Sequence, residues 1–411
     1  MVDPVFILGG SQSDFARSLT RDGRGLKELT HDTVHAALQQ ASLDARDIAS
    51  IHVANAFGEL FTGQAQLGAM PATAVPELWG VPAMRHEGAC ASGSLAVLAA
   101  MSEIEAGRYD CVLVLGLEQE RNVPGDVAAR FMGAAAHAGH EGQDARFLWT
   151  AMFARIADAY AERHGLRHEH LAAIARKNFA NAARNPLAQT RGWRFTDTSF
   201  TADDTANLVV EGRLRRQDCS QVTDGAAAVV LASARFAAAH AARTARPLSA
   251  FGRIAGWGHR TVGLSLAEKL HRAEDGYLFP HVRAAAADAY RRANIPGPAA
   301  LSGIETHDCF TISEYMAIDH LGITAPGESW RAIEAGMLEL GGALPVNPSG
   351  GLIGGGHPVG ATGVRMLFDA HKQVTGAAEA CQIAGADRLL TFNLGGSTTT
   401  SVCLIVETGA P

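Results

Sequence analysis

The chain has 411 residues, of which 47% are hydrophobic and 6% aromatic, and its formal net charge is −7. A chain of this length exceeds what one compact core normally accommodates, so we expect two or three subdomains. The acidic balance, together with the lack of a run of Lys and Arg, argues against nucleic-acid binding.

Three sequence features bear on the compartment. The N-terminal segment MVDPVFILGG contains an acidic residue and only a short apolar run, so we do not expect a secretory signal. No stretch approaches roughly 18 uninterrupted apolar residues, so we expect no membrane span. The C-terminal segment ETGAP lacks a peroxisomal address. We therefore expect a cytoplasmic protein.

The first part of the chain alternates short apolar runs with alanine-rich segments of helical spacing, which is typical of an α/β fold. Helices are predicted at Thr30–Ala41 and Ser92–Ala106, and Gly107 ends the second of them. Strands are predicted at Val5–Leu8, Ile51–Ala54, Cys111–Leu115 and Ala226–Leu231.

Residues 118–217 have a different composition, which is richer in Arg, His, Asn and Asp. Helical patterns cover Ala151–His164 and Glu169–Ala183 within this stretch. Because it is too long for a simple connection, we expect an inserted helical loop domain that forms one wall of the substrate entrance.

The C-terminal part repeats the pattern of the N-terminal part. The turn and helix start at Gly88–Gly93 align with Gly356–Gly360, and the apolar run after Asp110 aligns with the run after Asp387. The sequence therefore predicts two βαβ halves related by a pseudo-twofold axis, formed by residues 1–117 with 218–245 and by residues 246–411. The predicted elements of the second half are Gly303–Thr306, Ala361–Val374, Arg388–Phe392 and Ser401–Val406.

Cys90 stands where a predicted helix begins. The preceding Gly88 and Ala89 permit a tight turn from strand to helix. A thiol in this place is close to the unpaired N–H groups of the helix start, which favour the thiolate and could bind an oxyanion. Taken alone, the pattern fits a buried structural cysteine equally well.

His357 stands in a second glycine-rich turn. Gly354, Gly355 and Gly356 precede it, and Pro358 suits the first position of a helix. A fixed imidazole beside a thiol is what Cys-based acyl transfer requires, because the imidazole takes the thiol proton. A phosphate-binding loop is the alternative, but neither GxGxxG nor a Lys-Ser/Thr pair stands at the required spacing.

His307 and Cys309 flank Asp308 after a predicted strand, and period-two alternation puts both side chains on one side. In isolation, such a pair more often holds a hydrogen-bonded imidazole and an inert thiol. We expect no metal site, because the six cysteines form no CxxC pair and no further ligands stand at suitable spacing.

Four motifs resemble those of the thiolase superfamily, and together they are highly specific. The stretch HDCF, at residues 307–310, is similar to the sterol-carrier-protein type of thiolase, where ordinary thiolases carry Asn-Glu-Ala-Phe. The resemblance extends from the first predicted strand to the last. It implies two halves in a layered αβαβα arrangement around two sheets, with a loop domain inserted in the first half. The four motifs are Gly88–Gly93, residues 218–227, Val346–Gly351 and Gly356–Gly363.

The resemblance also implies roles for individual residues. Cys90 corresponds to the nucleophile that accepts the acyl group, and His357 to the imidazole that takes its proton and then helps to bind the thioester oxygen. His307 corresponds to the Asn that builds this oxyanion hole through water. Gly395 corresponds to the residue whose N–H completes the second oxyanion hole, which includes Cys90.

One departure concerns the second catalytic cysteine. Ordinary thiolases take it from a Cys-x-Gly-Gly motif near the C-terminus, but this chain has Asn-Leu-Gly-Gly at residues 393–396. In the sterol-carrier-protein type the HDCF cysteine fills this role, so Cys309 is the candidate acid/base. Cys381 and Cys403 compete for the role, but the first lies outside this turn and the second lies within a predicted strand.

The implied reaction is the thiolase cleavage or formation of 3-oxoacyl-CoA through an acyl-Cys90 intermediate. Coenzyme A is expected as substrate and acyl carrier against the inserted domain, with no tightly bound cofactor, and a homodimer or dimer of dimers is implied. Two alternatives stay open. One is retro-aldolase or carbon-acyltransferase chemistry with a small OB-like partner. The other is a non-catalytic acyl-CoA-binding subunit, which the presence of Cys90 and His357 disfavours.

Overall fold

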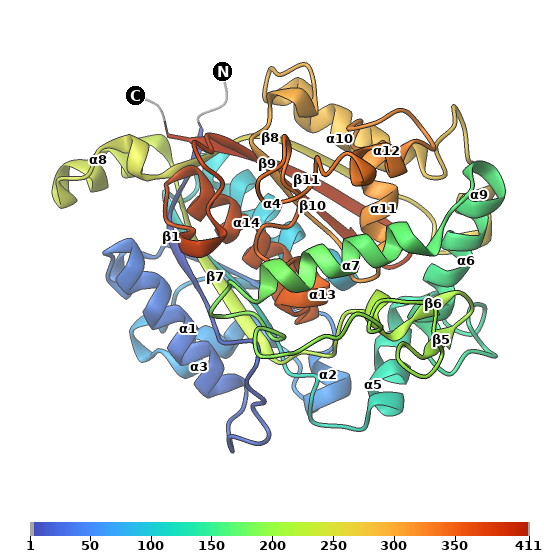
Figure 1. Ribbon diagram of the computed structural model, residues 1–411. Coiled ribbons are helices and arrows are strands. Elements are labelled where there is room, and N and C mark those ends of the chain that lie inside the picture. Colours follow the sequence, from blue (N-terminus) through green and yellow to red (C-terminus); the bar gives the residue numbers. More distant parts are fainter. Residues whose placement is uncertain (1–3, 410–411) are drawn as a thin grey trace.

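The computed structural model describes residues 4–409 (Figure 1). It contains one nine-stranded sheet in the order β3-β2-β4-β7-β1-β8-β11-β10-β9. Its strands are β1 Val5–Gln12, β2 Ser50–Ala54, β3 Ala83–His86, β4 Cys111–Glu118, β7 Gly225–Ala232, β8 Gly252–Thr261, β9 Gly303–Thr306, β10 Arg388–Gly395 and β11 Thr400–Thr408. The larger helices are α1 Leu26–Ala41, α4 Ser92–Glu105, α5 Gly125–Met132, α6 Leu148–His164, α7 His168–Ala182, α8 Ala234–Thr244, α10 Pro280–Arg292, α11 Thr311–His320 and α14 Thr362–Val374. The shorter helices are α2 Gly58–Thr62, α3 Met70–Ala74, α9 Leu266–His271, α12 Ser329–Glu334 and α13 Gly351–Gly355.

Four strands of each half pair in the same pattern, and β3, which is parallel to β2 at the edge of the first half, has no counterpart in the second. In the first half β2 is parallel to β4, and β7 is antiparallel to both β4 and β1. In the second half β9 is parallel to β10, and β11 is antiparallel to both β10 and β8. The halves meet where β1 pairs antiparallel with β8, from Val5 to Ile7. The two-sheet core implied by the resemblance is therefore joined into one hydrogen-bonded sheet at this short junction.

Helices α4 and α14 form the middle layer between the two halves of the sheet. Buried side chains of the first half, such as Val114, and of the second half, such as Leu404, pack in one core with both helices. Helix α1 covers the outer face of the first half and α10 that of the second. The arrangement is the layered αβαβα thiolase fold.

The two central helices touch through glycines. A Cβ on Gly93 of α4 would lie 2.8 Å from the N of Gly363, and a Cβ on Gly363 of α14 would lie 2.3 Å from the N of Ser94. Because no other residue has the space, the helix starts cross in backbone contact. This contact brings the turn that carries Cys90 against the second half.

The predicted elements are present, with shifted ends. Helix α1 begins at Leu26 rather than Thr30, because the Glu28 carboxylate accepts a hydrogen bond from the Gly25 N–H at 3.0 Å. Strand β8 was not predicted, since its glycines obscure the pattern. A Cβ on Gly258 would lie 1.8 Å from the carbonyl oxygen of Ala285, so glycine is what allows α10 to pack on this strand.

The repeat alignment made from the sequence is wrong at the helix starts. A 3₁₀ turn, Ala89–Ala91, leads into α4, and a matching turn, Val359–Ala361, leads into α14. When the helix starts are matched, the counterpart of Cys90 is therefore Gly360. The comparison of the two halves by sequence matches Cys90 with His357, which lies three residues before Gly360, because both stretches are rich in glycine.

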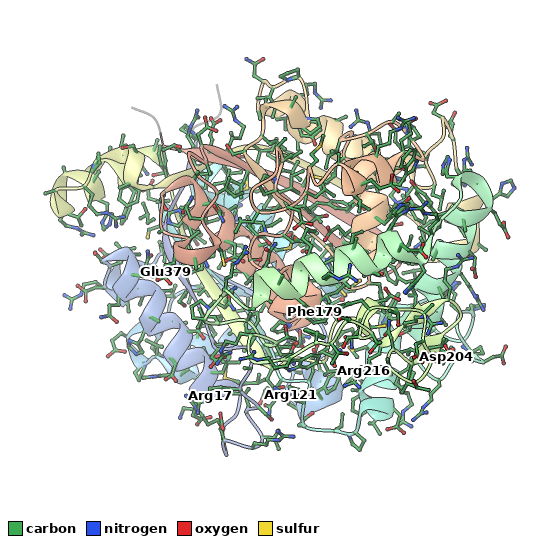
Figure 2. The ribbon with its side chains drawn as sticks, in the orientation of Figure 1. Arg17, Arg121, Phe179, Asp204, Arg216 and Glu379 are labelled. Atoms are coloured by element: carbon green, nitrogen blue, oxygen red, sulfur yellow. The ribbon has the colours of Figure 1, made fainter. Side chains whose placement is uncertain are left out.

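Within residues 118–217 the chain forms α5, α6, α7 and a small hairpin of β5 (Val209–Glu211) and β6 (Leu214–Arg215). Phe179 of α7, labelled in Figure 2, contacts the rings of Trp193, Phe195 and Phe200. Helix α7 also packs against α13, which leads into the turn of His357. Among residues 4–409, no helix combines the length and apolar character needed to cross a bilayer.

Candidate active site

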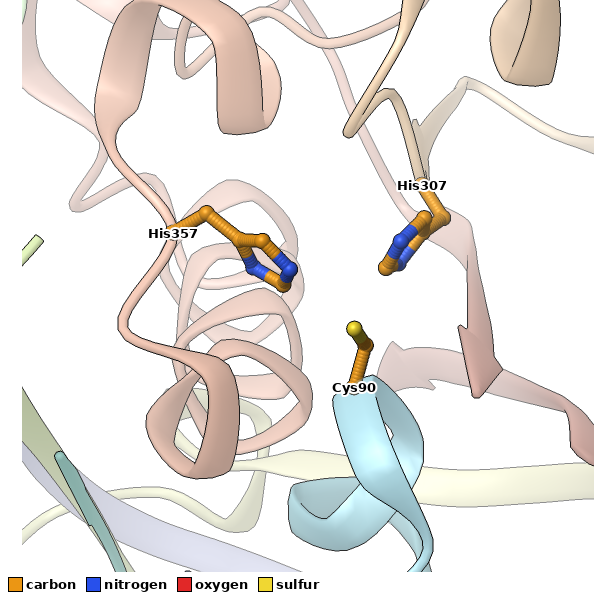
Figure 3. A group of neighbouring side chains, drawn as sticks. All are labelled: Cys90, His307 and His357. Carbon is orange, nitrogen blue, oxygen red and sulfur yellow. The ribbon is translucent and has the colours of Figure 1, made fainter. Parts of the chain in front are cut away.

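Cys90 lies in the 3₁₀ turn before α4, and its sulfur points into the gap between the imidazoles of His307 and His357 (Figure 3). Ala89, the preceding residue, has a φ of 50°, a left-handed conformation that costs a non-glycine residue free energy. The strained turn presents the thiol at the helix start, as the sequence predicted.

The three side chains converge from three separate segments. One ligand-type atom of each, the sulfur of Cys90 and a ring nitrogen of His307 and of His357, lies within 4.8 Å of the others. The two rings are perpendicular, with centroids 5.3 Å apart. This set could hold a zinc ion through three donors, and it also has the composition of a nucleophile with two proton carriers.

The hydrogen bonds of His357 fix its tautomer. Its Nδ1 is 2.7 Å from the hydroxyl oxygen of Thr362, and that hydroxyl donates to the carbonyl oxygen of Pro358 at 2.9 Å. Because the hydroxyl proton is already used, Thr362 accepts a hydrogen bond from Nδ1–H. The Nε2 atom therefore carries a lone pair, and it has no hydrogen-bond partner among residues 4–409. His357 is built to accept a proton.

Asn393 assigns the opposite tautomer to His307. Its Nδ2 donates to the carbonyl oxygen of Cys90 at 3.0 Å, and the same group lies 3.0 Å from Nδ1 of His307. A carbonyl oxygen only accepts, so the amide orientation is fixed and Nδ1 of His307 is the acceptor. The proton of this imidazole is consequently on Nε2. His307 is built to donate a hydrogen bond.

Burial keeps all three groups neutral. It lowers the pKa of His357 to about 3, with the charge of Arg365 adding to the effect. Burial, followed by the charges of His357 and Arg365, lowers the pKa of His307 well below its usual range. Burial and the nearby Glu120 raise the pKa of the Cys90 thiol to about 12, although the N–H of Gly396 acts in the other direction.

This result corrects the expectation that the helix start favours the thiolate. In the turn before α4 the N–H groups of Gly88, Ala89 and Ala91 already donate hydrogen bonds. The remaining N–H groups lower the pKa of Cys90 by less than burial and the nearby carboxyl group raise it. The resting nucleophile is a thiol. Its proton has to be removed during the reaction, and the free lone pair of His357 is the group placed to take it.

Cys309 lines the same cavity as Cys90 and His357. The cavity measures about 250 Å³, and most of its wall is apolar. The sulfur of Cys309 lies 3.7 Å from the hydroxyl oxygen of Ser313, while burial and the neighbouring Cys90 raise its pKa well above the usual range. Cys381 and Cys403 are also buried, but neither lines this cavity.

The remaining family motifs hold these residues in place. The Asp308 carboxylate accepts hydrogen bonds from the N–H groups of Leu352 and Ile353 in α13, which connects HDCF to the turn of His357. The hydroxyl of Thr223 accepts a hydrogen bond from the His357 N–H at 2.9 Å. These two contacts join three distant segments of the chain.

The structure adds residues that the sequence did not identify. Thr362 and Asn393 set the tautomers, and Asn393 occupies the place of the cysteine in the Cys-x-Gly-Gly motif. Gly396, rather than the predicted Gly395, lines the cavity and directs its N–H at the sulfur of Cys90. Gly395 packs against the turn, since a Cβ there would lie 2.2 Å from the carbonyl oxygen of Gly88.

Comparison with known proteins agrees with this geometry. Residues 5–193 match the family described as Thiolase, N-terminal domain, and residues 264–408 match Thiolase C-terminal domain-like. The acetyl-CoA acetyltransferase of Methanothermobacter thermautotrophicus is 30% identical over 394 residues, which cover 96% of each chain. The chain belongs to the thiolase family. A second similar protein is sterol carrier protein 2 of Homo sapiens, with 28% identity over 95% of this chain and 70% of that protein.

Solved structures of low sequence identity share the thiolase fold. The Ltp2-ChsH2(DUF35) aldolase superposes with a TM-score of 0.78 at 22% identity and covers 100% of this chain and 99% of that chain. The acetyl-CoA acetyltransferase from Syntrophomonas wolfei superposes with a TM-score of 0.68 at 18% identity and covers 99% of each chain. At these identities the likeness concerns the fold alone.

Proposed function

We propose that this member of the thiolase family is a CoA-dependent acyltransferase that cleaves or forms 3-oxoacyl-CoA through an acyl-Cys90 intermediate. One observation carries the proposal. The thiol of Cys90 faces an imidazole with a free lone pair, His357, and a second imidazole with the opposite tautomer, His307. A proton acceptor and a hydrogen-bond donor at one sulfur are what acyl transfer to a thiol needs.

In the cleavage direction, Nε2 of His357 takes the proton of Cys90 as the sulfur attacks the 3-oxo carbon. The Nε2–H of His307 and the newly formed Nε2–H of His357 then stabilise the alkoxide. As the carbonyl re-forms, the bond between the second and third carbons breaks. Its electron pair leaves with the acetyl-CoA enolate, and the shortened acyl group stays on Cys90.

We assign the second proton transfer to Cys309. Its thiol protonates the α-carbon of the departing enolate, and the resulting thiolate takes the proton of the incoming CoA thiol. CoA then attacks the acyl-Cys90 thioester, while His357 returns its proton to the sulfur of Cys90. The raised pKa of Cys309 supports this role, because it keeps the group protonated until the enolate forms. Coenzyme A acts here as substrate and acyl carrier.

The proposal is tested by mixing the purified chain with acetyl-CoA and measuring intact mass, with peptide mapping to locate the adduct. We expect one acetyl group, and we expect it on Cys90. Cleavage of acetoacetyl-CoA by free CoA is then followed spectrophotometrically. A chain that forms no adduct and cleaves no acetoacetyl-CoA would contradict the proposal, and a parallel sample with EDTA tests whether a metal at these residues contributes.

Cys309→Ala separates the two thiols. We expect this variant to accept an acetyl group on Cys90 while losing carbon–carbon bond cleavage, because the enolate has no proton donor. Cys381→Ala is the matched control, since its buried thiol lies outside the cavity. Retained cleavage by Cys309→Ala would show that another group carries the proton.

A retro-aldolase acting with a small partner protein is the second candidate function. The observation in its favour is the high TM-score with the Ltp2-ChsH2(DUF35) aldolase, together with Asn393 in place of the second thiolase cysteine. A retro-aldol cleavage forms no acyl-Cys90. Release of a free ketone or aldehyde from a 3-hydroxyacyl-CoA, without a mass adduct, would favour this function.

The exposed edge of the sheet supports a homodimer. Within residues 4–409, strand β3 pairs only with β2, Met84 within it is 45% exposed, and the nearby Trp79 is 83% exposed. An open edge with apolar side chains is suited to a partner strand. Light scattering of the purified chain gives its oligomeric state.

We also propose that the protein is cytoplasmic, since the six free cysteines fit a reducing compartment.

A further inference from the structure

Glu120 is a buried carboxyl group in the wall of the active-site cavity. It follows the end of β4 by two residues, its exposure is 0%, and it lines the same cavity as Cys90 and His357. Neither of its carboxyl oxygens makes a hydrogen bond of normal geometry among the described residues, although the N–H groups of Val359 and Thr223 lie close enough to act on the carboxylate. A buried polar group of this kind requires an explanation, because leaving it unpaired is costly.

Glu118 shows what a structural carboxylate looks like in the same surroundings. It is as deeply buried as Glu120, yet it accepts hydrogen bonds from the side chain of Asn55 and from the backbone N–H groups of Phe57 and Gly360. These bonds tie β2 and the turn before α14 to β4. The N–H groups near Glu120, those of Val359 and Thr223, make no comparable hydrogen bonds to it, so a role in holding the fold does not account for this carboxyl group.

The backbone of Glu120 is held firmly even though its side chain is not. Asp224 accepts hydrogen bonds from the N–H groups of Glu120 and Arg121, both at 2.7 Å, and its other oxygen accepts one from the N–H of Leu19. Arg121 is labelled in Figure 2. These hydrogen bonds hold the backbone of the loop, and the carboxyl group lies at the cavity wall.

The charge state of Glu120 follows from its surroundings. Burial is the main cause, and the charges of Glu118 and Asp224 add to it, so the pKa of Glu120 is raised well above its usual range. The N–H groups of Val359 and Thr223 act in the other direction and are outweighed. A protonated carboxyl group can both donate and accept a hydrogen bond.

The rest of the wall offers an acyl chain mainly apolar contacts. A saturated chain that fills the cavity excludes water and leaves the Glu120 carboxyl without a partner, whereas a chain with an oxygen substituent supplies one. A site that contains such an unpaired buried polar group selects a substrate that can form a hydrogen bond with it. The apolar wall includes Phe57, Met132, Phe147, Trp149, Phe153 and Phe310.

We propose that Glu120 is a specificity-determining residue, which hydrogen-bonds a hydroxyl or keto oxygen on the acyl chain that Cys90 carries. The substrate class is then an acyl-CoA with an oxygen function within the chain, beyond the oxygens of the reacting 3-oxoacyl group. This inference rests on the proposed function, since it concerns the acyl group of the acyl-Cys90 intermediate.

The test compares hexanoyl-CoA with three hydroxylated analogues that carry the hydroxyl on the third, fourth or fifth carbon. The rate of acylation of Cys90 is measured for each by rapid quenching and intact mass. We expect the wild-type chain to prefer at least one analogue by about tenfold to about hundredfold. Glu120→Gln keeps the shape and the hydrogen-bonding groups and should keep the preference. In Glu120→Met the ratio of the acylation rate with the preferred analogue to that with hexanoyl-CoA should fall to about one, whatever the absolute rates.

Each outcome decides the inference. A preference that survives in Glu120→Gln and disappears in Glu120→Met supports it. A wild-type chain that acylates all four substrates within twofold overturns it, as does a Glu120→Met chain that slows all four equally. If no substrate acylates Cys90, the proposed function itself has failed. Circular dichroism melting curves of both variants show whether the fold is retained.

Discussion

The two halves of the molecule use the same element of structure, a 3₁₀ turn leading into a central helix, in different ways. In the first half the turn carries the nucleophile Cys90, which is partly exposed at the cavity. In the second half the matching residue is Gly360, which is buried and cannot carry a side chain, because a Cβ there would lie 2.7 Å from the Cα of Asn55. Only one of the two turns has space for a catalytic side chain.

The catalytic side chains of the second half therefore lie outside the 3₁₀ turn that leads into α14. His357 lies three residues before Gly360, and Thr362, at the start of α14, holds its imidazole. His307 comes from the end of β9 and is held by Asn393 of β10. A repeated scaffold thus carries an asymmetric site, in which the first half provides the nucleophile and the second half provides the groups that move and bind its proton.

Removal of the nucleophile should have the largest effect. We expect Cys90→Ala to lose the mass adduct and to reduce turnover roughly 10⁴-fold or more, because Cys90, of the three thiols that line the cavity, is the one grouped with both imidazoles. The reaction is followed by intact mass and by acetoacetyl-CoA cleavage. An adduct that persists on another cysteine in Cys90→Ala would contradict the division of roles between the halves.

Removal of the base should be less severe. We expect His357→Ala to slow acylation of Cys90 by roughly 10²- to 10⁴-fold, because the thiol, with its pKa of about 12, then loses its proton only to solvent. Acylation by acetyl-CoA is measured at several pH values, and the rate should rise with pH in the variant. A pH-independent loss would indicate that His357 only shapes the turn.

Thr362 tests how the second half orients that base. We expect Thr362→Val to lower the acylation rate by about tenfold, because Nδ1–H of His357 loses its acceptor and the imidazole no longer favours the tautomer with a free Nε2. Thr362→Ser is the matched control, since it keeps the hydroxyl and should retain most of the rate. The KM for acetyl-CoA should change little in either variant, and a loss confined to KM would contradict a positioning role.

The sequence predicts the positions of the site residues better than their tautomers and protonation states. Local patterns were enough to place Cys90 in the turn that leads into a helix and His357 in a glycine-rich loop, since such turns and apolar periodicity are encoded by neighbouring residues. They did not place the helix start of the second half correctly, because His357 lies before the 3₁₀ turn Val359–Ala361 that leads into α14. The tautomer of His307 depends on Asn393, which lies 86 residues away in the chain. Such long-range contacts carry no local signal.

Two expectations from the sequence differ from the structure because they also depend on long-range contacts. The expected thiolate of Cys90 considered the helix start alone, whereas burial and the carboxyl of Glu120 decide the pKa in the folded chain. Gly395 was expected at the cavity, but the way β10 packs against Gly88 brings Gly396 there instead. Both outcomes depend on how distant segments pack, which spacing within one motif does not reveal.

The smallest expected effect is that of pH on the acylation rate of the wild-type chain, which tests the protonation state of His357 in the second half. Because burial lowers the pKa of His357 from its usual 6.5 to about 3, the imidazole stays neutral and able to accept a proton in mildly acidic solution. We expect the acylation rate of the wild-type chain to vary by less than about threefold between about pH 5 and about pH 7. The unfolded chain binds a proton at this His below about pH 6.5 while the folded chain does not. The free energy of unfolding should therefore decrease as the pH is lowered from about 7 to about 5. Acylation rates at constant temperature, with circular dichroism to confirm that the chain is folded, separate the two effects, and an acid limb centred near pH 6.5 in the folded protein would mean that the second half holds an ordinary solvated imidazole.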